Sequence, residues 1–172
     1  TAGGSALPYD ILSAAAQSTL PLVLGSNHDE DRLWSAMDPL QAEFGQHDWE
    51  RVSGEVFGDR AADARAVYEK LRPTETPKQL ISSVRTDTAF RQRAQRLAEQ
   101  HASRSNPTWM YWFTWATPAF GGILGSCHAL DVPFAFDNLS APGTDLLTGD
   151  GTERAGIATR FANEIVEFAR SS

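Results

Sequence analysis

The sequence has few cysteines and no long apolar runs. Cys127 is its only cysteine among 172 residues, so no internal disulfide can form. No apolar run approaches the roughly 20 residues that a membrane-spanning helix needs, and the first residues lack the basic and apolar regions of a signal peptide. We therefore expect a soluble protein without a membrane partner. The sequence leaves a cytoplasmic and a secreted bacterial setting equally open.

Basic residues are scarce relative to acidic ones. The chain carries 15 Lys and Arg against 22 Asp and Glu, which gives a formal net charge of −7. Binding to a nucleic-acid backbone needs clustered Lys and Arg, so we expect no nucleic-acid partner. The remaining composition, with 41% hydrophobic and 22% charged residues, is that of an ordinary globular protein. The length fits one domain or part of one, over residues 1–172.

Two apolar stretches, residues 20–25 and 107–115, are typical of strands buried in a parallel sheet. Such a sheet would bury the aromatic side chains of 107–115 on alternating sides, rather than present them as a binding wall. Apolar periodicity and capping residues predict helices at 11–17, after Asp29 or Asp31, at 61–71, at 77–84, at 86–101 and at 157–169, and a short helix plus loop at 44–56. This order indicates an α/β fold. Two strands alone leave backbone groups and apolar faces without neighbours, so we expect a piece of a larger sheet.

The polar turns after these two stretches carry the candidate catalytic residues. Glu30 lies in the first turn and His128 in the second. A histidine that accepts a serine proton and a carboxylate that orients its imidazole are two of the three groups of a serine hydrolase. The order of acid before histidine is that of α/β-hydrolases. Spacing alone also allows His128 to be an ordinary loop histidine.

The third group, a serine in a Gly-x-Ser-x-Gly turn, does not occur in these 172 residues. Ser5 lacks the second glycine of that motif and a preceding strand, so we interpret it as part of a frayed end. Cys127 is expected to be a packed thiol, because nucleophile and base usually come from separate elements. The run 28–31 is acid-rich, but adjacent residues cannot all point at one ion and the spacing is not that of a calcium loop. We therefore expect neither a metal nor a cofactor.

Several segments resemble, in the same order, the C-terminal part of type-B carboxylesterases, the family of para-nitrobenzyl-type esterases and cholinesterases. Residues 21–30 (PLVLGSNHDE) are similar to the segment that carries the triad acid of that family. Residues 125–136 (GSCHALDVPFAF) resemble its triad-histidine loop, and 111–115 (YWFTW) its penultimate strand. The resemblance begins near residue 7 and also includes the helices at 86–98 and 161–170.

This resemblance implies the C-terminal part of an α/β-hydrolase fold, with few central strands and several covering helices, incomplete alone. It implies hydrolysis of a carboxylic ester, with Glu30 as the orienting acid and His128 as the general acid/base. The acyl-enzyme would form on a serine of a complementary N-terminal polypeptide, so we expect the isolated chain to be inactive. The alternatives are a non-catalytic fragment or interaction module, and a fragment produced by proteolysis.

Three residues depart from the family pattern. Asp31 stands where the family usually has Gly after the triad acid, Asp131 where it has Glu after the histidine, and Asp137 where it has Gly. Asp31 adds negative charge beside Glu30 and is expected to alter the acid loop most directly.

Overall fold

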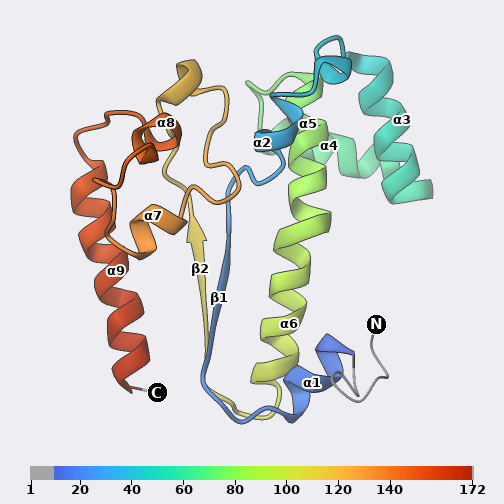
Figure 1. Ribbon diagram of the computed structural model, residues 1–172. Helices are drawn as coiled ribbons and strands as arrows, with labels where there is room; N and C mark the ends of the chain where they lie inside the picture. The colour runs from blue at the N-terminus through green and yellow to red at the C-terminus, as the bar shows by residue number, and fades with distance from the viewer. Residues whose placement is uncertain (1–9, 172) are drawn as a thin grey trace.

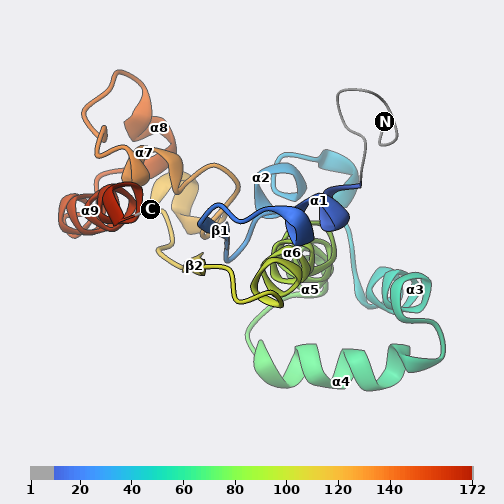
Figure 2. The same cartoon turned by 90° about the horizontal axis from the view of Figure 1, so that it is seen from below.

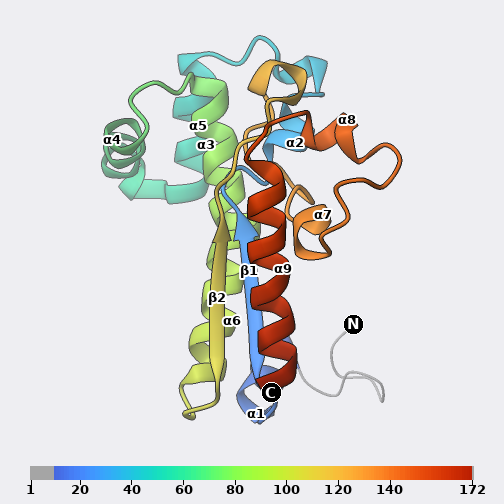
Figure 3. The same ribbon diagram turned by 90° about the vertical axis from the view of Figure 1, so that its left-hand side faces the viewer.

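The computed structural model describes residues 10–171 and contains a two-stranded parallel sheet between helices. Strand β1 (Leu22–Asn27) pairs with β2 (Thr108–Phe113) along its full length. Helix α6 (Gln92–Ala102) covers one face of the sheet, and α9 (Arg154–Ser171) covers the other (Figure 1). Figure 3 shows the same three layers from the α9 side. The expected α/β fold class is confirmed.

Helices and short turns connect and flank the two strands. The remaining elements are α1 (Ile11–Gln17), α2 (Arg32–Ser35), η1 (Pro39–Gln41), α3 (Gln46–Phe57), η2 (Gly58–Arg60), α4 (Ala61–Leu71), α5 (Pro77–Thr86), η3 (Asp87–Arg91), η4 (Ala119–Gly122), α7 (Val132–Ala135) and α8 (Thr144–Thr148). The elements from α2 to α6 lie between β1 and β2 in the chain. They form the long crossover that a parallel pair of strands requires.

Helix α5 begins where the sequence predicts. The Thr76 hydroxyl accepts a hydrogen bond from the Gln79 N–H at 3.4 Å, and Gln79 Oε1 accepts one from the Thr76 N–H at 2.8 Å. Pro77 occupies the first helical position, where its missing N–H costs nothing. This reciprocal capping box fixes the N-terminus of α5.

A predicted helix restart at Thr86 or Asp87 is wrong. Helix α5 continues through η3, a single π turn, into α6, and the three form one rod in Figure 1. No Gly or Pro interrupts residues 78–102. The buried Thr86 hydroxyl does not cap a new helix, because it accepts a hydrogen bond from the Asp31 N–H at 3.0 Å. Single π turns often occur at functional sites.

The short helix plus loop predicted at 44–56 is instead one helix of 12 residues, α3. Trp49 and Val52 of α3 pack into a cluster with Leu80, Ile81 and Val84 of α5. Figure 2 shows α3 and α4 beside α5, on the side away from α9. Burial against α5 therefore fixes a helix whose own sequence pattern is weak.

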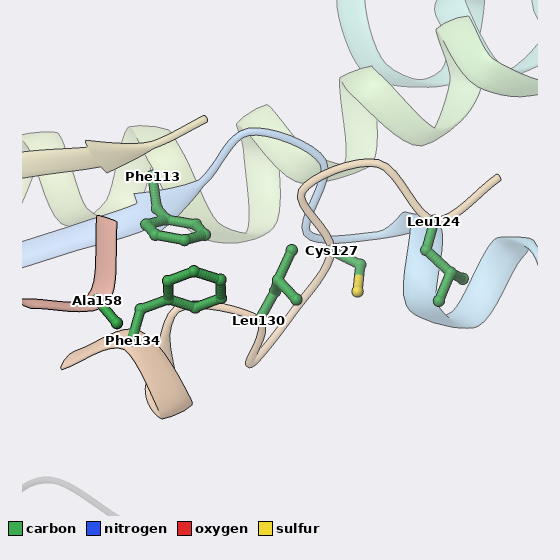
Figure 4. Close-up of a cluster of buried hydrophobic side chains, with 6 residues drawn as sticks. All are labelled: Phe113, Leu124, Cys127, Leu130, Phe134 and Ala158. Carbon is green, nitrogen blue, oxygen red and sulfur yellow. The ribbon is translucent and has the colours of Figure 1, made fainter. Parts of the chain in front are cut away.

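A second apolar cluster anchors the loop that carries His128. Its buried members come from β2, the following loop, α7 and α9, and Figure 4 shows them packed side by side: Phe113, Leu124, Cys127, Leu130, Phe134 and Ala158. Cys127 is completely buried, and this burial raises the pKa of its thiol to about 11. The prediction of a packed thiol is confirmed.

The sheet is open at both edges among the described residues, because β1 and β2 pair only with each other. The expectation of buried aromatic residues in β2 is therefore wrong for Trp109 and Trp112, which are 50% and 55% exposed. Tyr111 and Phe113 do pack, against Phe161 of α9 at ring distances of 5.0 and 5.8 Å. Trp109 contacts Phe168 of α9 at a ring distance of 5.4 Å, and Trp112 stacks on His28 at 5.1 Å, so both rings are partly covered and stay about half exposed.

Gly25 of β1 gives a first test of this packing. The Tyr111 ring lies across the strand, only 2.5 Å from where a Cβ of residue 25 would stand. We expect Gly25→Ala to lower the free energy of unfolding by about 1–3 kcal/mol, the usual cost of overpacking, as measured by urea denaturation. Gly54→Ala in α3 is the matched control, because nothing lies within 4 Å of its Cβ position. Equal effects at both glycines would contradict the close approach.

Candidate active site

The candidate site lies where the carboxyl ends of β1 and β2 meet. The His28 N–H donates to the Phe113 carbonyl at 2.9 Å and so extends the ladder into the two loops. One loop carries Glu30 and the other carries His128. Parallel pairing places both loops at the carboxyl ends of the strands, which is where ligands bind in α/β folds.

Glu30 and His128 are in direct contact. His128 Nδ1 lies 2.7 Å from Glu30 Oε2, and the His128 N–H donates to the Glu30 carbonyl at 3.3 Å. The other carboxylate oxygen accepts a hydrogen bond from the Asn27 N–H at 2.7 Å. The Glu30 side chain is 6% exposed, whereas that of His128 is 42% exposed. An ionised Glu30 can only accept, so it holds the proton of a neutral His128 on Nδ1 and leaves Nε2 as the basic nitrogen.

Two aromatic rings flank the imidazole. Trp34 of α2 lies 4.9 Å from the His128 ring, and Phe90 of the π turn lies 5.3 Å from it. The Trp34 and Phe90 rings also stack on each other at 6.0 Å. Trp34 is exposed, so this wall has an open apolar surface. The sequence does not predict either residue as part of the site, because their proximity depends on the uninterrupted rod of α5 and α6.

A first clasp, formed by Asp29 and Ser126, joins the acid loop to the histidine loop. The Asp29 N–H donates to the Ser126 carbonyl at 2.9 Å, and the Ser126 N–H donates to Asp29 Oδ2 at 3.0 Å. Gly125 has φ +58°, and a Cβ there would collide with Asp29 Oδ2. Burial alone would raise the pKa of the Asp29 carboxyl, but His28, Arg32 and the Ser126 N–H together lower it. Asp29 is therefore held as a charged cross-link.

A second clasp consists of Asn27, Asp131 and Tyr111. The Asn27 amide donates to the Cys127 carbonyl at 2.7 Å and to Asp131 Oδ1 at 3.0 Å. The Tyr111 hydroxyl donates to Asp131 Oδ2 at 2.8 Å. The pKa of Tyr111 is raised, mainly by burial and secondly by this hydrogen bond. Sequence analysis noted Asp131 only as a departure from the family pattern. The polar Asn27 at the end of an apolar run was the available signal for the rest of the clasp.

The side chains of residues 28–31 diverge. His28 Nδ1 contacts Asp29 Oδ1 at 2.9 Å, while Glu30 points to His128. Asp31 lies on the α5 side, where its N–H donates to the Thr86 hydroxyl. Within residues 10–171, no group of three or more His, Cys, Asp or Glu side chains could hold a metal ion.

His28 belongs to a network of charged residues that supports the acid loop. Its carbonyl accepts a hydrogen bond from Arg91 at 2.9 Å, and its Nε2 lies 3.4 Å from Arg72. Arg72 and Arg32 both contact Glu75, at 2.9 and 2.6 Å. The network ties the acid loop to the start of α5 and to the π turn.

The chain as a whole matches a family of known proteins. The model of the carboxylesterase family matches residues 5–172. The chain belongs to the carboxylesterase family. Its resemblance to type-B carboxylesterases is thereby confirmed at family level.

Two relatives of this carboxylesterase-family chain are much longer than it is. A phenmedipham hydrolase of Pseudarthrobacter oxydans is 30% identical over 134 residues, which are 77% of this chain and 26% of that protein. A solved structure of a PNB esterase matches 95% of this chain and 33% of its own, with a TM-score of 0.66 and 24% identity. The chain thus spans about a quarter to a third of these relatives, and the second match shows that its fold is part of an α/β-hydrolase.

Three other sequence predictions concern Ser5, a membrane span and a helix cap. Ser5 lies outside the described residues. No helix among the described residues is long and apolar enough to cross a membrane. Of the two residues predicted to cap the helix after the acid loop, Asp31 occupies the N-cap position of α2, but its side chain makes no capping hydrogen bond.

Asp31 offers a test of the acid loop through pH. Burial raises the pKa of its carboxyl, which Ser82 and Arg85 offset only in part, and Oδ2 is buried without a hydrogen-bond partner. We expect Asp31→Asn to stabilise the chain by about 1 kcal/mol at pH 7, at the low end for such a group because the side chain is only partly buried.

The pH dependence has a definite sign. With a raised pKa, the folded state binds more protons than the unfolded state above the ordinary carboxyl pKa, so stability falls as pH rises through that window. The gain from Asp31→Asn should therefore shrink as pH falls toward about 4, the ordinary Asp value. Urea unfolding at both pH values measures it, with the exposed Asp59→Asn as control. A gain independent of pH would contradict the raised pKa.

Proposed function

We propose that this chain supplies the acid and the histidine of a Ser-His-Glu triad in a carboxylic-ester hydrolase. The observation that carries the proposal is the 2.7 Å contact between His128 Nδ1 and the buried Glu30 carboxylate. Family membership supports ester hydrolysis as the class of reaction. The nucleophilic serine belongs to a part of the enzyme that these 172 residues do not contain.

The geometry defines a role for each group. His128 Nε2, on the exposed side of the ring, accepts the serine proton during attack and returns it to the leaving alcohol. Glu30 stays ionised and stabilises the imidazolium that forms between these steps. The Asn27 N–H, at 2.7 Å from Oε1, fixes the carboxylate oxygen that does not contact His128. The two clasps keep both loops in place, so little reorganisation is needed when the serine arrives.

We infer that the partner is a complementary N-terminal polypeptide that carries Gly-x-Ser-x-Gly. The fraction of each relative that the chain covers, 26% and 33%, supports this. So do the unpaired edges of the sheet and the exposed Trp109 and Trp112. An unpaired strand edge is a template for another strand, and exposed aromatic side chains gain free energy when they are covered.

A second candidate is an interaction module without catalytic activity. The same exposed aromatic side chains favour it, since they need a partner whether or not that partner carries a serine. The relative named phenmedipham hydrolase supports hydrolysis over a purely structural role. We extend to this chain the hydrolysis of a carboxylic ester and not that particular substrate.

Native mass spectrometry separates the two candidates. A second polypeptide with Gly-x-Ser-x-Gly, bound to this chain, is the result expected of a split hydrolase. A folded species at 18.8 kDa, which gains no esterase activity when mixed with the N-terminal polypeptide of a relative, would favour the module.

Within an active complex, His128→Ala should abolish turnover of the ester while circular dichroism stays that of the wild type. Glu30→Gln should lower kcat by about 10⁴-fold, because an amide cannot hold the productive tautomer or stabilise the imidazolium. His47→Ala, at an exposed position of α3, is the matched control. Near-normal turnover in His128→Ala would refute the assignment, and a mild effect of Glu30→Gln would point to Asp29 as the acid.

A further inference from the structure

The exposed side of His128 is the side that carries Nε2. Nδ1 faces the buried Glu30 carboxylate at 2.7 Å, and 42% of the side chain reaches solvent, so we infer that the accessible edge of the ring is the opposite one. Donation of the Nδ1 proton to a carboxylate raises electron density at Nε2, as it does for metal-bound histidines. The chain alone therefore presents an oriented imidazole nitrogen to solvent.

The other three histidines lack this combination. His28 also contacts a carboxylate, Asp29, but its Nε2 faces the Arg72 guanidinium. His101 is 1% exposed, and its Nε2 is buried. His47 lies exposed on α3 and belongs to neither apolar cluster. Only His128 among them joins an orienting carboxylate to an accessible Nε2.

An apolar aromatic surface stands beside this nitrogen. The rings of Trp34 and Phe90 lie 4.9 and 5.3 Å from the imidazole, and Trp34 is exposed. Aromatic pairs gain free energy in offset-stacked and edge-to-face arrangements at such distances. A flat aryl group that rests on Trp34 would bring an attached ester carbonyl within reach of Nε2.

We propose that the isolated chain has an activity of its own, a slow acyl transfer from activated aryl esters onto His128 Nε2. It rests on the geometry of the proposed acid and histidine pair and needs no serine and no partner chain. We still expect the isolated chain to be inactive toward ordinary alkyl esters, because this reaction requires a leaving group much better than an alkoxide.

The step balances in atoms and charge. Nε2 attacks the ester carbonyl carbon, the carbon–oxygen bond to the aryl group breaks, and the aryloxide departs with the electron pair. The resulting N-acyl-imidazolium keeps its Nδ1 proton in the hydrogen bond to the ionised Glu30. Water then attacks the acyl carbon and releases one proton to solvent, the nitrogen–carbon bond breaks, and the products are a carboxylic acid and the restored neutral imidazole.

The test uses 4-nitrophenyl acetate and the chain alone, with release of 4-nitrophenolate followed by absorbance. We expect His128→Ala to lower the second-order rate constant by roughly 10- to 100-fold. A positioned acid–base group typically contributes about 100-fold or more to a rate, so this is a small effect by comparison. Glu30→Gln should also lower it, and Trp34→Ala should lower it more for aryl esters than for an activated alkyl thioester. His47→Ala is the matched control and should react like the wild type.

Two further measurements keep the result interpretable. Peptide mapping of the acid-quenched wild type should find the acetyl group on His128, and this does not depend on whether a variant folds. Pretreatment with a fluorophosphonate, which blocks serine nucleophiles, should leave the rate unchanged. Label on lysines alone, or a rate equal to that of His128→Ala, would overturn the proposal. Either result would leave the triad proposal standing, since its test depends on a serine from the partner.

Discussion

The parallel pairing of β1 with β2 is the constraint on which the rest of the structure depends. Parallel strands end at the same edge of a sheet, so one pairing brings together two loops that lie about a hundred positions apart in the chain. The register then decides which side chains can meet. A slip of one residue would turn every side chain of β1 to the opposite face and would carry Glu30 away from His128.

Two hydrogen-bonded clasps convert this pairing into a fixed site. Asp29 joins the loops through the backbone of Ser126, while Asn27 and Asp131 join them through the Cys127 carbonyl and the Tyr111 hydroxyl. Asn27 Oδ1 is buried without a partner, but the amide nitrogen of Asn27 and the carboxylates of Asp29 and Asp131 are paired. Such buried hydrogen bonds rigidify a structure, because another arrangement would leave these groups unpaired. The acid and the histidine are therefore held in contact within the chain itself, without the remainder of a hydrolase.

The sheet around this fixed site is incomplete. Helices α6 and α9 cover its two faces, yet within residues 10–171 both strands have an unpaired edge and Trp109 and Trp112 remain exposed. The chain corresponds to about a third of the PNB esterase whose fold it shares. An organised Glu30–His128 pair on a partial sheet fits the proposed hydrolase, in which a serine from outside these residues completes the triad, and it lets chemistry at His128 be considered separately.

Sequence alone determined the elements whose information is local. Apolar runs gave both strands, Thr76 and Pro77 gave the start of α5, and the Gly-x-Ser-x-Gly motif was absent by inspection. The segments around Glu30 and His128 were sufficient for the family.

Tertiary structure decided what depends on contacts between distant segments. The continuous rod through the π turn puts Phe90 beside His128, and burial of Trp49 against α5 makes α3 a full helix. The clasps of Asn27 and Asp29 were also decided by tertiary structure, because each joins residues that are far apart in the sequence and nothing in the sequence predicts their contact. The intrinsic preference of a segment for helix or turn is small compared with the free energy of packing against distant segments, so these features appear only in the folded chain.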